Sequence, residues 1–213
     1  MPLRYCSFIS YRHCVGYKGQ TFTERIVEDL KAELELRVTQ QVFRDVERLK
    51  GAEFYHEELA SALCMSVCMV VLYWPTYFSD EHAFCAREFK AMESLEAKRL
   101  KLLPRDQRTK GLIIVVALRG FESIPSEIRQ RRLCKDFEAY TLKPDMREDP
   151  GFQSDIFEIS KYIADRVNAF KRLAKDPFTG CDSFRLPPEK EIIAWIKAVS
   201  HPGLPFANRE IVA

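Results

Sequence analysis

The sequence predicts an α/β fold with a flavodoxin-like, doubly wound sheet of five parallel strands, followed by a C-terminal helical tail. Short apolar segments alternate along the chain with longer segments of helical periodicity, and two of the apolar segments are hydrophobic on both faces. Strands of that kind lie inside parallel sheets that helices cover on both sides. Because crossovers between parallel strands are right-handed, we expect the strand order 2-1-3-4-5.

The first part of the chain opens with an apolar, aromatic-rich segment at residues 5–11, which predicts the first strand. Thr21 and Glu24 have the spacing of a capping box, and regularly spaced apolar residues follow them. We therefore expect an amphipathic helix over residues 22–37 with Thr21 as its N-cap. The pattern then alternates, with strands at residues 40–45, 67–74 and 111–118 and helices at residues 54–64 and 81–99.

The second part of the chain is less regular. Residues 136–141 predict a weaker fifth strand, and apolar residues spaced by three and four predict a helix over residues 156–170. A stretch punctuated by Pro and Gly then leads to a short helix at residues 189–199. We therefore expect one domain at residues 1–174 and an extension at residues 175–213, which either packs on the domain or mediates association.

The composition is that of a globular protein and favours no charged partner. The 213 residues are 46% hydrophobic and 30% charged, and the formal net charge of +2 gives no reason to expect nucleic acid or an anionic membrane as partner. The basic residues at 128–135 are interpreted as a solvated face. No apolar run has the length of a membrane span, and residues 1–12 lack the apolar region of a signal peptide, so we expect a cytoplasmic location.

The seven cysteines favour a reducing compartment. They are scattered without metal-ligand pairs, and several lie inside apolar runs. Cys64 and Cys68 are four residues apart but have no second pair and no nearby His, which argues against zinc. We therefore expect no metal site, and we interpret the cysteines as small buried hydrophobic residues.

The predicted fold also indicates where a ligand would bind. Open α/β sheets bind ligands beyond the carboxyl ends of the strands, at the point where the strand order reverses. In the predicted order, that point lies between the first and third strands. Phe84 and Glu88 are four residues apart and share one face of the third helix, which begins there. With Arg12 and Arg44 after the first two strands, the cleft would suit a ligand that has a ring, a sugar and phosphates.

Three segments in order carry a family resemblance: FISYRH, VFRDVERLKGAEFYHEELASAL and CMVVLYWPTYFSDEHAFCAREF. Together they resemble a Toll/interleukin-1 receptor (TIR) domain, and most of all the bacterial, NAD-cleaving branch of that family. The resemblance covers residues 5–170 and leaves the tail uncovered. It implies a flavodoxin-like fold, cleavage of NAD as a substrate without a separate cofactor, and activity that often depends on self-association.

The resemblance also implies roles for individual residues. The catalytic glutamate of the family falls on Glu88, and the aromatic residue one turn before it falls on Phe84, where active members commonly have Trp. The mobile loop through which members associate falls on residues 45–54. A different loop, at residues 13–20, is longer than in the family. The residues expected to bind the substrate are Ser10, Tyr11, Arg12, Arg44, Asp45 and Phe84.

A single carboxylate is sufficient for this chemistry. Most glycosidases need two, because a poor leaving group must be protonated while the sugar is attacked. The nicotinamide of NAD is already cationic and departs as a neutral molecule, so one fixed carboxylate such as Glu88 can stabilise the developing charge on the ribose and orient the attacking water. The plainer alternative is that Glu88 is a solvated helix acid paired with Arg87 or Lys90.

The resemblance leaves more than one function open. The first is NAD hydrolysis or cyclisation, which in bacteria points to anti-phage immunity; no sensor domain is recognisable, so we expect a separately encoded sensor or effector. The second is a non-catalytic TIR interaction module, which would give no reason for an acid at Glu88. A two-component receiver is excluded, because it needs a phosphoacceptor Asp at the end of the third strand, where this chain reads LYWPTY.

Overall fold

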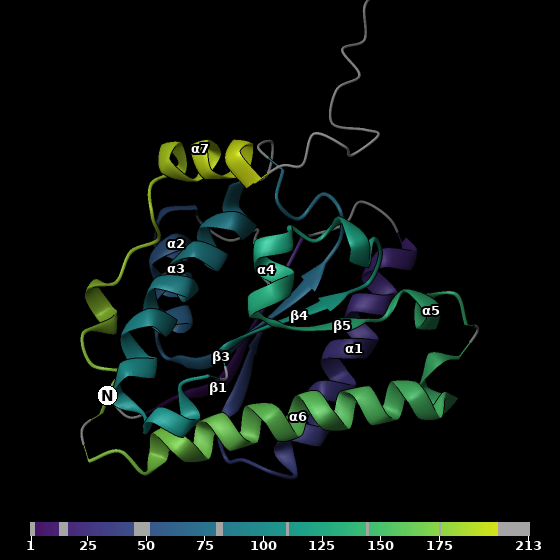
Figure 1. The fold of residues 1–213 in the computed structure, drawn as a ribbon, viewed down its shortest axis with the longest axis horizontal. Coiled ribbons are helices and arrows are strands. Elements are labelled where there is room, and N and C mark those ends of the chain that lie inside the picture. Colours follow the sequence, from purple (N-terminus) through teal and green to yellow (C-terminus); the bar gives the residue numbers. More distant parts are fainter. Residues whose placement is uncertain are drawn as a thin grey trace, which may run out of the picture.

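Five parallel strands form one sheet in the order β2-β1-β3-β4-β5, with helices on both faces (Figure 1). This is the fold class and the strand order that the sequence predicts. The computed structural model describes residues 3–12, 17–44, 52–79, 83–109, 111–143, 145–174 and 176–199.

The strands at the centre of the sheet are buried along their whole length. β1 is Tyr5–Tyr11, β3 is Ser66–Tyr73 and β4 is Ile113–Ala117, and every residue in the three is buried. This burial explains why these segments are apolar on both faces. The outer strands are shorter and partly exposed: β2 is Gln41–Arg44 and β5 is Leu133–Asp136.

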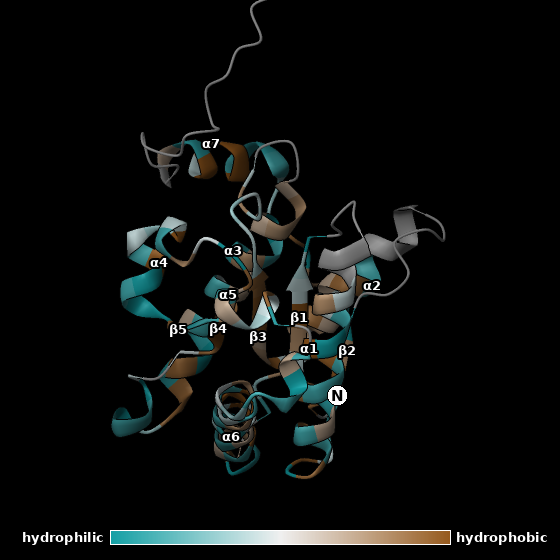
Figure 2. Ribbon diagram, turned by 90° about the vertical axis from the view of Figure 1, so that its right-hand side faces the viewer, coloured by the Kyte–Doolittle hydropathy of each residue, from teal (hydrophilic) through white to brown (hydrophobic). Residues whose placement is uncertain are grey.

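The helices form two layers. α1 and α6 pack on each other over one face of the sheet, and α2 and α3 cover the other (Figures 1 and 2). The helices are α1 Tyr17–Glu35, α2 Ala52–Cys64, α3 Ala83–Arg99, α4 Ser126–Arg131, α5 Glu138–Thr141, α6 Pro150–Lys171 and α7 Glu189–Val199. Short 3₁₀ turns lie at Leu100–Leu102, Arg105–Gln107, Phe121–Ser123, Met146–Glu148 and Cys181–Ser183.

Two element boundaries differ from the prediction. α1 begins at Tyr17, so Thr21 lies inside the helix and is not its N-cap. The spacing of Thr21 and Glu24 misleads because residues three apart also share a face within a helix. The fifth strand lies at Leu133–Asp136, before the predicted segment, and residues 138–141 form α5.

The side chain of Asp136 explains the turn after β5. One of its carboxylate oxygens accepts a hydrogen bond from the backbone N–H of Glu138 at 3.0 Å, which bends the chain into a helical turn. Phe137 and Tyr140 then meet at 5.2 Å between ring centroids. Their three-residue spacing suits a helix and not a strand.

The basic residues at 128–135 are not simply a solvated face. The side chain of Arg132 is 10% exposed and forms ion pairs with Glu93 and Glu96 of α3. Lys135 forms ion pairs with Asp155, at 2.8 Å, and with a second acid of α6. Arg132, the residue before β5, is therefore joined to α3, and Lys135 of β5 is joined to α6 on the opposite face of the sheet.

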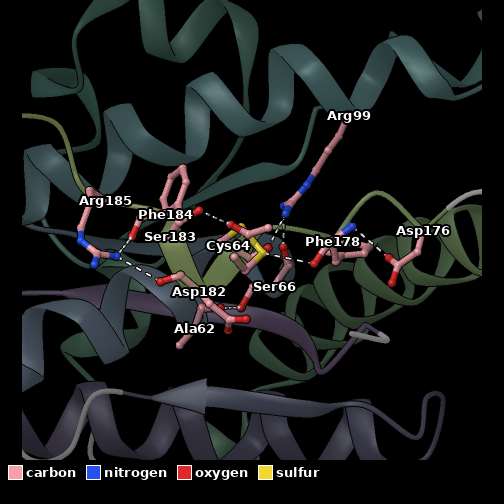
Figure 3. The surroundings of a disulfide bond; sticks show 12 residues. Ala62, Cys64, Ser66, Arg99, Asp176, Phe178, Asp182, Ser183, Phe184 and Arg185 are labelled. Atoms are coloured by element: carbon pink, nitrogen blue, oxygen red, sulfur yellow. Dashed lines mark hydrogen bonds between the residues drawn. A yellow bond between two sulfur atoms is a disulfide. The ribbon is translucent and has the colours of Figure 1, made fainter.

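The C-terminal extension packs on the domain. Cys181 forms a disulfide with Cys64, at a Cα–Cα distance of 5.4 Å (Figure 3). Arg185 pairs with Glu57 of α2 at 2.9 Å, and α7 packs on α3. Figures 1 and 2 place α7 on the side of the molecule toward which the strands point.

The disulfide contradicts the prediction for two of the seven cysteines. Cys64 and Cys181 are 117 residues apart, and no local spacing reveals such a pair. Disulfides persist mainly in oxidising compartments, so the pair also weighs against the predicted cytoplasmic location. Of the other cysteines in the described ranges, Cys6, Cys68 and Cys134 are free thiols, and Cys85 is buried. None of the described helices is long and apolar enough to cross a membrane.

Candidate functional site

Glu88 lies in the second turn of α3, and its side chain points into the protein. It is 2% exposed, and the hydroxyl of Ser10 donates a hydrogen bond to its Oε2 atom. The plainer alternative, a solvated acid paired with its neighbours, is therefore wrong. Arg87 donates from Nε to the carbonyl of Pro187 at 2.8 Å, and Lys90 pairs with Glu93.

The contact between Ser10 and Glu88 lies at the point where the strand order reverses. Ser10 is the penultimate residue of β1 and is in register with Val71 of β3. β1 and β3 are the neighbouring strands from which the chain continues in opposite directions across the sheet. The structure thus places these two predicted residues together at the carboxyl ends of the strands, where α/β folds bind ligands.

Tyr77 is a third member of this group, and the sequence analysis missed it. Its side chain is 0% exposed, and its hydroxyl lies 2.5 Å from the hydroxyl of Ser10. The same hydroxyl lies 3.5 Å from the carbonyl oxygen of Cys85. The available signal was an aromatic residue with a polar group just beyond the third strand, at the expected ligand edge.

Tyr11 and Arg44 form a separate group on the other face of the sheet. Arg44 donates from Nε to the Tyr11 hydroxyl at 3.4 Å, and its guanidinium lies 3.8 Å from the carboxylate of Glu24 on α1. Successive side chains of a strand point to opposite faces, so Ser10 faces α3 while Tyr11 faces α1. A ligand that met both groups would have to cross the end of β1.

The remaining predicted residues border the same edge or lie outside the described ranges. Phe84 is partly buried one turn before Glu88, and the guanidinium of Arg87 lies 5.7 Å from the centre of its ring. Arg12 is partly exposed at the end of β1. Asp45, and with it residues 45–51 of the predicted association loop, lies outside the described residues; residues 52–54 begin α2.

A cavity of about 400 Å³ lies away from Glu88, between α1 and α6. It is lined in part by Glu33, Arg147 and Ile156, on the face of the sheet opposite α3. It is therefore not the predicted site. Within the ranges that the structure describes, no group of three or more His, Cys, Asp or Glu side chains is placed to hold a metal ion.

The Ser10–Glu88 contact has a specific chemical meaning. An ionised carboxylate is costly to remove from water unless hydrogen bonds replace its hydration. Here a hydroxyl from the end of the central strand supplies one such bond. A carboxylate held in this way has a fixed position and is able to stabilise a positive charge that develops beside it.

Comparisons with known proteins add nothing about activity. No family model matches the chain, and neither does any curated protein. Among solved structures, an oxidoreductase from Corynebacterium diphtheriae is similar, with 16% sequence identity and a TM-score of 0.43. The match covers 79% of this chain and 98% of that chain. A likeness of this strength supports no conclusion about what this chain binds or does.

Proposed function

We propose that this protein is a TIR-type NAD glycohydrolase in which Glu88 is the catalytic carboxylate. It would cleave the nicotinamide–ribose bond of NAD to give nicotinamide and either ADP-ribose or a cyclic ADP-ribose isomer. The observation that supports the proposal most is the buried position of Glu88 at the reversal point of the sheet, with Ser10 donating to it. The choice of NAD as the substrate rests on the resemblance of three sequence segments to TIR domains.

The proposed reaction needs no general acid. The bond between ribose C1′ and the nicotinamide nitrogen breaks, and its electron pair returns to the cationic ring, which leaves as a neutral molecule. Glu88 stabilises the positive charge that develops on the ribose. The oxygen of a water, or an internal nucleophile of the dinucleotide in cyclisation, then forms the new bond to C1′ and loses its proton.

Substrate access requires a conformational step. Glu88 is 2% exposed, so a ribose reaches it only after side chains over the strand ends move. Such a step is a common point of control in enzymes. It fits activity that depends on self-association through the loop at residues 45–54, or on a separately encoded sensor in anti-phage immunity. A cytoplasmic location, where NAD is supplied, is part of this proposal, although the Cys64–Cys181 disulfide weighs against it.

One observation favours a second candidate, a non-catalytic TIR interaction module. The same burial and the same hydrogen bond would let Glu88 serve only as a structural link between α3 and β1. In that case the protein would assemble with partners and leave NAD intact. The two functions differ in whether the unaltered protein releases nicotinamide from NAD.

The test is to incubate the protein with NAD and to separate the products by chromatography. We expect nicotinamide release by the unaltered protein and a loss of at least about a hundredfold in Glu88→Gln, which keeps the volume and removes the charge. Glu93→Gln, on the exposed side of the same helix, is the matched control and should keep full activity. Protein concentration should be varied, because association should raise the activity per molecule.

The second candidate is favoured if the unaltered protein releases no nicotinamide at any concentration. Equal turnover in Glu88→Gln would also overturn the proposed role of the carboxylate. The same chromatograms separate linear from cyclic products, so one experiment resolves the reaction type as well.

A further inference from the structure

The hydroxyl of Ser10 has two neighbours and only one proton. It lies within hydrogen-bond distance of Glu88 Oε2 on one side and of the Tyr77 hydroxyl on the other. In the proposed function Glu88 acts as an ionised carboxylate, which accepts hydrogen bonds and donates none, so the proton of Ser10 points to Glu88. The Tyr77 hydroxyl, 2.5 Å from Ser10 Oγ, must then be the donor in the second bond.

We propose that Tyr77 is a positioning residue for Glu88 and acts through Ser10. The inference rests on the proposed function, because it concerns the geometry of the catalytic carboxylate. When the Tyr77 hydroxyl donates to Ser10 Oγ, the Ser10 hydroxyl donates its own proton to Glu88. Without the phenol, the Ser10 hydroxyl loses the bond that fixes its rotation, and the carboxylate loses a fixed partner. The order Tyr77 to Ser10 to Glu88 is one directional chain of hydrogen bonds.

The position of Tyr77 suits this role. The carbonyl oxygen of Cys85 lies 3.5 Å from the Tyr77 hydroxyl, so the bond to Ser10 is the better of these two. The ring is fully buried and meets Phe78 edge to face at 4.8 Å. The backbone N–H of Tyr77 donates to the carbonyl of Trp74 at 2.8 Å. A side chain held by packing and backbone contacts is what a precise site needs behind its reacting group.

A purely structural role makes a different prediction. The same chain of bonds joins the loop after β3 to β1 and α3, so its loss would lower stability in either case. A structural role would leave the turnover of the folded protein unchanged. A positioning role lowers kcat and leaves KM nearly constant, because the substrate still binds while the charge beside C1′ is misplaced.

The experiment compares Tyr77→Phe with Tyr73→Phe. Both variants keep the ring and delete one buried phenol, but the Tyr73 hydroxyl bonds to the carbonyl of Ser123 at 3.0 Å and not to Ser10. We expect Tyr77→Phe to lower kcat by about ten- to a hundredfold, as for other groups that orient a reacting side chain, with KM within about threefold. Tyr73→Phe should keep kcat within about twofold. A Tyr77→Phe variant that is folded and keeps full kcat would overturn the inference.

A second measurement does not depend on activity. Denaturant midpoints are measured for Ser10→Ala, Tyr77→Phe and the double variant. If the two hydroxyls act in one chain, the double variant should shift the midpoint by clearly less than the sum of the single shifts. Additive shifts would show that the chain does not exist. If the midpoints are non-additive but the unaltered protein releases no nicotinamide, the proposed function fails and Tyr77 has only a structural role.

Discussion

Cys181 in the C-terminal extension is disulfide-bonded to Cys64, the last residue of α2 (Figure 3). The bond closes a loop across 117 residues of sequence, which includes β3, β4 and β5. A cross-link over so long a loop restricts the unfolded chain more than the folded one. Beside it, Arg99 donates to the carbonyl oxygens of Cys64 and Ser66, so the end of α2 is held on two sides.

Reduction of this bond should lower the free energy of unfolding. We expect a loss of about 2–5 kcal/mol, because the unfolded chain regains the entropy of the opened loop. The measurement is chemical denaturation with and without dithiothreitol. Cys181→Ser should resemble the reduced protein and should not respond to the reductant. The bond itself is disproved if a thiol reagent modifies all seven cysteines in denaturant without prior reduction.

Most of the sheet could be predicted because its signal is local. β1, β3 and β4 are buried throughout, and in β3 and β4 burial on both faces leaves a nearly continuous apolar run in the sequence. β5 carries no such signal, because it is short, lies at the edge and is mostly half-buried. The Cys64–Cys181 bond could not be predicted either, since it depends on how the extension folds back.

The candidate site was predictable in part. The predicted strand order places Glu88 at the reversal point, and the family resemblance adds Ser10. Tyr77 lies in the turn after β3 and belongs to no periodic pattern, so only its contacts reveal it. The sequence could have predicted that Tyr11 and Ser10 lie on opposite faces of the sheet, since consecutive side chains of a strand alternate between the two faces. The prediction of a single cleft overlooked this alternation.

A buried ion pair gives the second prediction. Glu96 of α3 has a side chain that is 5% exposed; it pairs with Arg132 and accepts a hydrogen bond from the backbone N–H of Leu112. Glu96→Ala should lower the free energy of unfolding by about 3 kcal/mol, because the guanidinium of Arg132 loses its buried partner and the N–H of Leu112 loses its acceptor.

Glu93 provides the control for this change. It binds the same Arg132 at 3.1 Å, but its side chain is 35% exposed, so Glu93→Ala should cost less than about 1 kcal/mol. Urea denaturation of both variants gives the comparison. Equal losses would mean that burial does not decide the strength of these two pairs.

The pH dependence of thiol reactivity gives the third prediction. Burial raises the pKa of Cys134 to about 11, although this side chain is partly exposed. The thiolate is the reactive form, so alkylation of Cys134 should be slow near pH 8 and should rise about tenfold for each pH unit up to pH 11. Mass spectrometry of the peptide that contains Cys134 measures the rate. In denaturant at the same pH the rate should increase; rapid alkylation of the folded protein near pH 7 would contradict the raised pKa.

The packing of α7 on α3 gives the fourth prediction. The indole ring of Trp195 stacks on Phe89 at 6.0 Å and meets Phe78 edge to face at 5.4 Å. Ile192 and Ile196 of α7 complete a small apolar cluster with α3 that is separate from the main core. Trp195→Ala removes one of the two rings that join this cluster to the main core; the other is Phe78.

We expect Trp195→Ala to lower the free energy of unfolding by about 2–4 kcal/mol, the usual range for truncating a large apolar side chain that is partly buried. Lys197→Ala, on the exposed side of the same helix, should change it by less than about 0.5 kcal/mol. Because Phe78 also contacts Tyr77, the loss of Trp195 should disturb the Ser10–Glu88 contact and, if the proposed function holds, lower NAD turnover as well. A variant that loses stability but keeps full turnover would show that the extension stabilises the domain without influencing the site.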